Sequence, residues 1–294
     1  MKTLFLKGCG TALLTPFSNG KVDYEAFAAS VDRQVASGVD FLVPLGTTGE
    51  TPCLSEQERI EVLKVAKAHA AGRPVIVGGG TNSLQGTVES MKLLEPYDPD
   101  AFLIVVPYYN KPSQQGQYEY FKAVASATSK PIVIYNVPGR TGANMQAATT
   151  LALARDVKNI IAIKEASGIF AQASEIIREA PEGFSVLSGN DDDTLALMAA
   201  GAKGVVSVAS NIAPKEVSDM VHALLNDDIV TARVLHHRLS PLFRNLFIES
   251  NPTPAKAAMA QLGLMENSLR LPLVKATPKT EEIIAKTLAD LWQK

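Results

Sequence analysis

The stretch Ile160-Ile161-Ala162-Ile163-Lys164-Glu165 decides the fold, because four apolar residues in a row end abruptly in two charged ones. A short apolar run without alternation is typical of a parallel strand that is covered on both faces. The charged pair then marks the point where the strand leaves the core. Similar runs recur along the chain, and the predicted strands are Cys9–Leu14, Phe41–Pro44, Val75–Val77, Phe102–Val106, Ile132–Tyr135, Ile160–Lys164, Ser185–Leu187 and Gly204–Ser207.

Amphipathic segments separate these runs and predict helices. One of them opens with Ser55-Glu56-Gln57-Glu58, a capping box that satisfies free amides of the first helical turn. Strands that alternate with helices predict an α/β fold, a (β/α)8 TIM barrel, over a doubly wound open sheet that lacks its Gly-x-Gly-x-x-Gly signature here. The predicted helices are Tyr24–Ala36, Ser55–Ala70, Gln117–Thr128, Gln146–Arg155, Phe170–Glu179 and Asp192–Ala200.

The pattern changes after about Asp227, where helical periods follow one another with no strand between them. These periods are Ile229–Phe247, Pro254–Leu262 and Pro278–Trp292. We therefore expect a catalytic barrel domain over residues 1–226 and a C-terminal helical extension over residues 227–294.

The composition is that of a globular protein, with 46% hydrophobic and 20% charged residues. A formal net charge of −2 gives no bulk attraction to nucleic acid or to an anionic membrane, and no apolar run reaches the ~20 residues of a membrane span. The apolar run Leu4–Leu6 is too short for a signal peptide. Cys9 and Cys53 form no CxxC motif, so we expect reduced thiols and a cytoplasmic protein.

The reactive side chains of a TIM barrel gather where the strands end. Lys164 ends the sixth predicted strand, and its removal from water favours the neutral amine that attacks a carbonyl. Tyr135 ends the neighbouring strand and could pass a proton to the substrate. The plainer alternatives are a lysine that pairs with Glu165 and a core tyrosine with a satisfied hydroxyl group.

Two other strand ends carry groups that suit carboxylates. Thr47 and Thr48 offer hydroxyl groups and backbone amides, although they could simply cap the turn before the Ser55 helix. Arg140 lies in a loop of proline and glycine, where its planar guanidinium suits a second carboxylate, although it could be merely solvent-exposed. Tyr108 and Tyr109 resemble interface tyrosines, with a local aromatic lid as the alternative.

A metal site has little support in the sequence. His236 and His237 are adjacent on a helix and point about 100° apart, so they do not converge on one ion. Asp191–Asp193 precede a helix, and we expect them to interact with its N-terminal dipole and to cap it. No ligand set is visible, which disfavours a metal-dependent aldolase.

Three motifs in this order resemble the pyruvate-dependent class I aldolase family. They are Gly46-Thr47-Thr48-Gly49-Glu50, Tyr135-Asn136-Val137-Pro138 with Thr141-Gly142, and Ile163-Lys164-Glu165. The similarity runs from about Gly8 to about Pro272. That family includes dihydrodipicolinate synthases, N-acetylneuraminate lyases and 2-keto-3-deoxygluconate aldolases.

Further features resemble the dihydrodipicolinate synthase branch, whereas the lyase branch usually lacks the arginine. They are Gly139-Arg140, Pro107-Tyr108-Tyr109-Asn110-Lys111-Pro112, and Asn251-Pro252-Thr253-Pro254-Ala255-Lys256 followed by Leu269-Arg270-Leu271-Pro272.

The resemblance implies a Schiff-base lyase without a cofactor, in the first committed step of diaminopimelate and lysine biosynthesis. Lys164 would form an imine with pyruvate, whose enamine attacks L-aspartate 4-semialdehyde to give 4-hydroxy-tetrahydrodipicolinate. The roles it implies are a proton relay of Tyr135, Thr48 and Tyr109, a pyruvate carboxylate site of Thr47 and Thr48, a semialdehyde carboxylate site at Arg140, and a pocket shaped by Gly189 and the backbone of Val206.

The resemblance also implies a homotetramer, a dimer of dimers in which Tyr109 reaches into a neighbouring subunit. Many members are inhibited by lysine, and Asn82 and Tyr108 fit that site. Positions that hold histidine or glutamate in sensitive members carry Glu56, Arg59 and Gly86, so we expect weak or absent lysine inhibition.

Two alternatives remain open from the sequence. One is a neuraminate or 2-keto-3-deoxy-sugar aldolase, which Arg140 disfavours because a neutral polyol aldehyde needs no guanidinium. The other is a catalytically inert relative that binds a keto acid, which the intact Lys164, Tyr135 and Thr48 disfavour.

Overall fold

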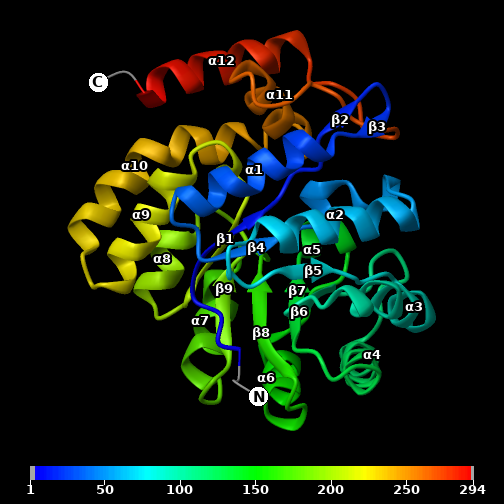
Figure 1. Ribbon diagram of the computed structural model, residues 1–294. Helices are drawn as coiled ribbons and strands as arrows, with labels where there is room; N and C mark the ends of the chain where they lie inside the picture. The colour runs from blue at the N-terminus through cyan, green and yellow to red at the C-terminus, as the bar shows by residue number, and fades with distance from the viewer. Residues whose placement is uncertain (1–3, 293–294) are drawn as a thin grey trace.

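Eight parallel strands form a closed barrel in the computed structural model, which describes residues 4–292 (Figure 1). The strands are hydrogen-bonded in the order β4-β1-β10-β9-β8-β7-β6-β5. A parallel bridge between Leu42 and Val75 closes the ring between its first and last members. The strand bounds are β1 Gly8–Ala12, β4 Phe41–Val43, β5 Ile76–Gly78, β6 Ala101–Val105, β7 Ile132–Asn136, β8 Ile160–Glu165, β9 Ser185–Ser188 and β10 Gly204–Ser207.

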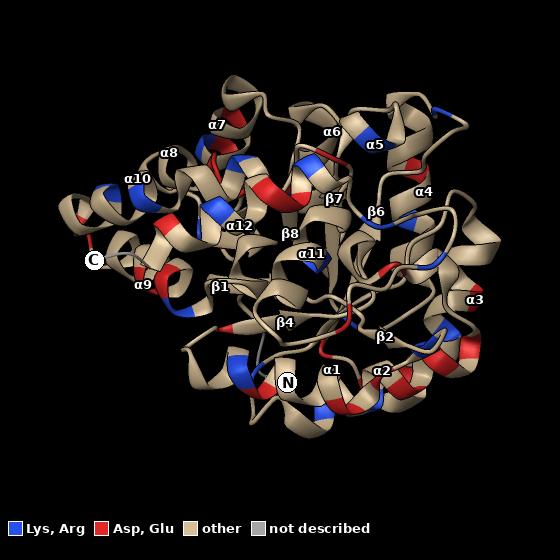
Figure 2. Ribbon diagram, turned by 90° about the horizontal axis from the view of Figure 1, so that it is seen from above, with Lys and Arg blue, Asp and Glu red and all other residues tan. Residues whose placement is uncertain are grey.

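Helices surround the barrel, and the view from above shows acidic and basic residues interspersed along them (Figure 2). Ser55 caps the second helix with the predicted capping box, in which its side chain accepts from the amide of Glu58. A small hairpin of β2 (Phe17–Ser18) and β3 (Lys21–Val22) precedes the first helix. The helix bounds are α1 Tyr24–Ala36, α2 Glu56–His69, α3 Leu84–Leu94, α4 Gln114–Ser126, α5 Pro138–Thr141, α6 Ala147–Asp156, α7 Phe170–Glu179, α8 Thr194–Ala199 and α9 Pro214–Leu225.

The apolar side chains divide into two clusters, because successive residues of a strand point to opposite faces. The larger cluster lies between the strands and the helices. The smaller one fills the barrel interior and includes Ala162, Leu187 and Tyr135. Lys164 is two residues beyond Ala162 and pairs in register with both Tyr135 and Leu187. Its side chain therefore belongs to the barrel interior.

The C-terminal extension consists of α10 (Ile229–Asn245), α11 (Thr253–Gln261) and α12 (Pro278–Trp292). Helix α10 packs against α9, and α12 packs against α10 and α11. The extension lies on the side of the barrel toward which the strands point (Figure 1). We propose a domain division between residues 226 and 227 from this change of pattern.

The predicted barrel with C-terminal helices is confirmed, but the predicted helices were incomplete. Helix α3 was missed because Gly86 and Ser90 lower its helical propensity, although Ser83 caps it through the amide of Gly86. Helix α9 was missed because Pro214 suggests a break, whereas here it occupies the first turn, where no amide hydrogen is needed. Helix α4 begins at Gln114 rather than Gln117 because Ser113 caps it.

Candidate active site

Lys164 lies inside the barrel at the carboxyl end of β8. The residue is 5% exposed, and its Nζ is 4.2 Å from the centre of the Tyr135 ring. Tyr135, at the end of the adjacent strand β7, is 8% exposed. Within residues 4–292, Lys164 forms no ion pair. The strand pairing thus brings an amine and a phenol ring into contact.

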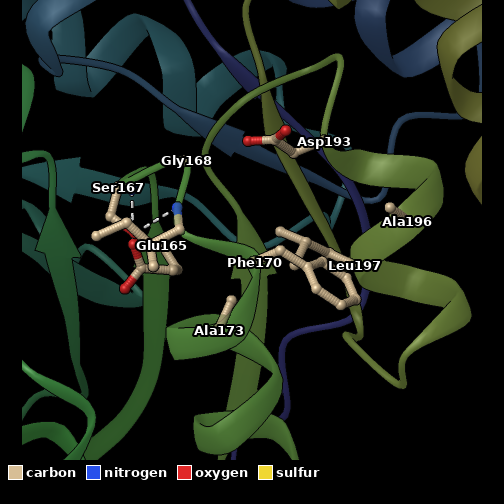
Figure 3. A pocket seen from close by; sticks show the side chains of 9 residues that line it. Glu165, Ser167, Gly168, Phe170, Ala173, Asp193, Ala196 and Leu197 are labelled. Carbon is tan, nitrogen blue, oxygen red and sulfur yellow. Dashed lines mark hydrogen bonds between the residues drawn. The ribbon is translucent and has the colours of Figure 1, made fainter.

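Glu165 turns away from Lys164 to the outer face of the barrel, so the pair considered from the sequence does not form. Its Oε1 accepts a 2.6 Å hydrogen bond from the amide of Ser167, and its Oε2 accepts bonds from Asn136 Nδ2 and Gln172 Nε2. Figure 3 shows Glu165 beside Ser167 at the end of the strand. Glu165 is thereby committed to the loop after β8.

Thr47 and Thr48 form a single 3-10 turn (η1, Thr47–Gly49) directly after β4. No side chain caps this turn, and Ser55 alone caps the following helix α2. Thr48 is 3% exposed, and its Oγ1 accepts a 2.9 Å hydrogen bond from Asn251 Nδ2. The end of β5 comes so close that a Cβ on Gly78 would lie 1.8 Å from the carbonyl oxygen of Leu45. Only glycine fits there.

A cavity of about 50 Å³ lies over the end of the barrel, and its lining includes Lys164, Tyr135 and Thr48. A second cavity of about 410 Å³ adjoins it, since Gly46, Thr47, Tyr135 and Arg140 line both. The smaller cavity is lined by Ala12, Val43, Gly46, Thr47, Thr48, Leu103, Tyr135, Val137, Arg140, Lys164, Ala166, Gly189, Asn190, Val208, Phe247 and Asn251. The amine therefore has a small enclosed space beside it and a larger one beyond.

Arg140 lies on the short helix α5, and its side chain lines the cavity. Its Nη2 donates a 3.1 Å hydrogen bond to the backbone carbonyl of Asn251. No carboxylate pairs with this guanidinium in the part of the chain that the structure describes. Because a guanidinium has five donors, most of them stay available to a substrate carboxylate.

Tyr109 is not brought to the cavity of its own chain. It is 86% exposed with a φ of 73°, and its amide donates a 3.2 Å hydrogen bond to the carbonyl of Thr141. Its neighbour Tyr108 is 39% exposed and lines the larger cavity. The loop thus directs one tyrosine toward the cavity and the other outward.

Gly189 and Val206 differ in how near they come to Lys164. Gly189 lines the small cavity, and a Cβ there would lie 2.5 Å from Cβ of Ala166. Val206 is buried in the barrel interior and does not line this cavity, where Val208 takes its place.

The side-chain cap that we expected from Asp191–Asp193 at helix α8 does not form. Asp193 occupies the N-cap position but makes no side-chain cap bond. Asp191 is buried, and its Oδ2 accepts hydrogen bonds from the amides of Val208 and Ala209 at 3.0 and 2.9 Å. Burial raises the pKa of its carboxyl group. Asp191 therefore anchors the loop after β10, which the sequence pattern did not reveal.

Three structural observations bear on the metal sites and membrane spans that were weighed from the sequence. Across residues 4–292, no three His, Cys, Asp or Glu side chains gather as a metal site would require. Burial lowers the pKa of His236, whose ring packs against Phe243. None of the described helices is long and apolar enough to cross a membrane.

The model of the Dihydrodipicolinate synthetase family matches residues 5–291. The chain belongs to this family. A 4-hydroxy-tetrahydrodipicolinate synthase from Parabacteroides distasonis is 48% identical over 99% of both chains. The predicted enzyme class, a Schiff-base lyase of the synthase type, is thereby confirmed.

Solved structures agree with this assignment. A dihydrodipicolinate synthase from Thermotoga maritima superposes with a TM-score of 0.96 at 42% identity, covering 98% of this chain and 99% of that one. A monomeric dihydrodipicolinate synthase variant gives the same TM-score and identity, covering 97% of this chain and 96% of that one. The chain thus shares nearly all of the fold of these two dihydrodipicolinate synthases.

The positions expected to bind lysine surround the larger cavity only in part. Tyr108 lines it, whereas Asn82 does not and instead accepts a 2.8 Å hydrogen bond at its carbonyl from Asn110 Nδ2. Arg59 lines it and donates to Ser90 Oγ, and burial lowers the pKa of its guanidinium. Gly86 lies in the first turn of α3 and contributes no side chain. Arg59 thus places a guanidinium beside the larger cavity of this dihydrodipicolinate synthase family member.

Sequence reasoning missed two residues from the C-terminal extension. Asn251 reaches both Thr48 and Arg140, as described above. Lys256 is 0% exposed and forms an ion pair with Glu50, two residues after Thr48. Both lie in the motif Asn251–Lys256, which the family resemblance had already singled out. No periodic pattern marks them, because Thr48 and Glu50, the partners of their side chains, lie about 200 residues earlier in the chain.

Proposed function

We propose that this chain condenses pyruvate with L-aspartate 4-semialdehyde through an imine on Lys164, giving 4-hydroxy-tetrahydrodipicolinate and water. The observation that carries the proposal is a buried lysine without a carboxylate partner, in a cavity that Thr48, Tyr135 and Arg140 also line. An amine at this position, beside a cavity and without a counter-ion, is placed to attack a carbonyl carbon.

The reaction follows from these positions. The Lys164 amine adds to the keto carbon of pyruvate and loses water, and Tyr135 is placed to move the protons of that step. The iminium withdraws electrons from the methyl carbon, which loses a proton to give an enamine. The enamine carbon attacks the aldehyde. The amino group of the semialdehyde then displaces Lys164 from the keto carbon and closes the ring.

The two carboxylates of the substrates have separate receptors in this proposal. The amides and hydroxyl groups of Thr47 and Thr48 hold the pyruvate carboxylate near Lys164. Arg140 holds the semialdehyde carboxylate, and its bond to the Asn251 carbonyl fixes its direction. Gly189 supports the space, since a side chain there would collide with Ala166. The backbone of Val206, in the barrel interior, would help to shape the pocket from below.

Borohydride trapping with pyruvate tests the core of this proposal. Reduction should leave a pyruvyl adduct on Lys164, found by peptide mass spectrometry, and the Lys164→Ala variant should retain none. Product formation from pyruvate and the semialdehyde should then be followed by mass spectrometry. A trapped adduct without product would favour a sugar-aldehyde substrate, and no adduct would favour an inert keto-acid binder.

We also propose that the protein works as a homotetramer, a dimer of dimers. Two separate apolar surfaces support this arrangement: Tyr108 and Tyr109 after β6, and Ile169 and Phe170 after β8, which are 46% and 52% exposed. The second surface borders a small hollow between α7 and α8 (Figure 3). Tyr109 would complete the proton relay of a neighbouring subunit, because it points away from its own cavity.

Subunit mixing tests the donated tyrosine. Tyr109→Phe and Lys164→Ala should each be nearly inactive alone, and mixed subunits should regain part of the activity because one site receives both native residues. Tyr109→Phe with unchanged turnover would remove it from the relay. The assembly itself is measured by analytical ultracentrifugation, where Phe170→Glu should lower the mass of the complex.

We also propose that lysine inhibits this protein weakly or not at all. Arg59 and Tyr108 line the larger cavity, and a guanidinium repels the ammonium group of lysine. Strong inhibition by lysine at low concentration would overturn this.

We propose a cytoplasmic location as well. Both cysteines, Cys9 and Cys53, are free thiols, in keeping with a reducing compartment.

A further inference from the structure

Asn251 connects the C-terminal extension to the reaction cavity at two points. It lies between α10 and α11 and is 4% exposed. Its side-chain Nδ2 donates to Thr48 Oγ1 at 2.9 Å, and its backbone carbonyl accepts from Arg140 Nη2 at 3.1 Å. It therefore touches a residue of the proposed relay and the proposed receptor for the second carboxylate.

The direction of the first bond fixes what the Thr48 hydroxyl can do. An amide nitrogen only donates, so Thr48 Oγ1 must accept in this bond. A hydroxyl group has one hydrogen, and that hydrogen then points away from Asn251. Within residues 4–292 it has no acceptor, while Thr48 itself lines the cavity. The hydroxyl hydrogen of Thr48 is thus not used by the described protein groups, beside a cavity that Lys164 and Tyr135 also line.

The backbone around Asn251 is well anchored. The amide of Thr253 bonds to the carbonyl of Ser250 at 2.9 Å, and Lys256 in the next turn pairs with Glu50. Glu50 itself lies two residues beyond Thr48 on the same turn. The turn that carries Thr48 is therefore held by the extension from two directions.

The Asn251 amide is only half satisfied. Its Oδ1 is buried and has no hydrogen-bond partner among the described residues. A buried acceptor that receives no hydrogen bond lowers the stability of the fold. The side chain thus contributes little to holding the fold, whereas its Nδ2 makes a specific bond at the cavity.

We propose that Asn251 is a positioning residue that orients the Thr48 hydroxyl for proton transfer, so that the C-terminal extension forms part of the active site. This inference rests on the proposed function. It predicts that Asn251→Asp, which replaces the donor by an acceptor, reverses the bond and withdraws the Thr48 proton from the cavity.

Steady-state kinetics test the reversal. We expect kcat to fall by about 10- to 100-fold in Asn251→Asp and Asn251→Ala, part of the factor that positioned proton transfer contributes, with KM for pyruvate little changed. Asn251→Ala removes the amide without adding charge, so it still tests the proposal if the acidic variant does not fold. Values of kcat within about 2-fold of the parent in both variants would overturn the proposal.

The matched control is Asn245→Asp, since Asn245 Nδ2 donates a 2.8 Å hydrogen bond to Thr287 Oγ1 within the same extension, away from the cavity. It should leave kcat unchanged. A double-mutant cycle decides whether Asn251 acts through Thr48: Thr48→Val with Asn251→Ala should be no slower than Thr48→Val alone. Multiplied losses would contradict the positioning role. Borohydride trapping in the parent separates a failure of this inference from a failure of the proposed function.

Discussion

Lys164 and Lys256 are both buried, at 5% and 0% exposure, and each lies against an aromatic ring. Nζ of Lys164 is 4.2 Å from the ring centre of Tyr135, and Nζ of Lys256 is 3.9 Å from that of Phe17. Their polar partners differ. Lys256 pairs with Glu50 and donates a 2.9 Å hydrogen bond to the carbonyl of Ser268, whereas Lys164 forms no ion pair within the described chain.

The comparison teaches that burial alone does not distinguish a reactive lysine from a structural one. Desolvation disfavours the ammonium form of Lys256. At Lys256 a carboxylate opposes that effect, and the balance lowers the pKa of Lys256 to about 8. A lysine that lies at a strand end, borders a cavity and lacks a counter-ion is the one to expect at a reaction centre.

The largest expected effect is on turnover in Lys164→Met. The imine can no longer form, so kcat/KM should fall by at least about 1000-fold. The unfolding midpoint in urea should not decrease, because the substitution removes a buried amine that has no ion-pair partner. A variant that retained activity, or that lost stability as Lys256→Met is expected to, would end the distinction between the two lysines.

A smaller effect, on stability, is expected in Lys256→Met. The substitution leaves the Glu50 carboxylate buried without its cation, which costs about 3–5 kcal/mol of the free energy of unfolding. Urea denaturation measures the change. Adding Glu50→Leu should recover part of the loss because no buried charge then remains. The matched control is Lys215→Met on α9, where the solvent-exposed pair with Asp219 should contribute nothing measurable.

The smallest expected effect is a dependence of stability on pH. Lys256 titrates near pH 8 in the folded protein, below its usual value of 10.5. Between these values the unfolded chain holds a proton that the folded chain has released, so the free energy of unfolding rises with pH. The difference in stability between the parent and Lys256→Met should therefore grow in favour of the parent from pH 8 to 10. A flat difference would show that Glu50 keeps the ammonium charged.

Much of the barrel could be predicted from sequence because its strands are local apolar runs. The run Ile160–Ile163 and the pairing of adjacent strands suffice to bring Lys164 beside Tyr135. Thr48 and Arg140 follow from the same rule, since each lies just beyond a strand. The helices α3 and α9 escaped prediction because Gly86 and Pro214 obscure their first turns.

The remainder depends on contacts that no local pattern records. Asp191 was expected at a helix cap, yet it binds the amides of Val208 and Ala209, which belong to the next strand's loop. Asn251 and Lys256 act on a turn about 200 residues earlier. Side-chain bonds across such separations are set by tertiary packing, and only the folded chain reveals them.

The bond from Asn251 to Thr48 has a consequence for the order in which the protein is made. Translation releases the chain from its amino end, and domains fold as they emerge. Lys164, Tyr135 and Arg140 all leave the ribosome well before residue 251. On the proposed role of Asn251, a nascent chain that has completed its barrel still lacks an oriented Thr48. Competence to react with pyruvate would thus wait until residue 251 has been synthesised and has folded onto the barrel, which couples activity to the C-terminal extension.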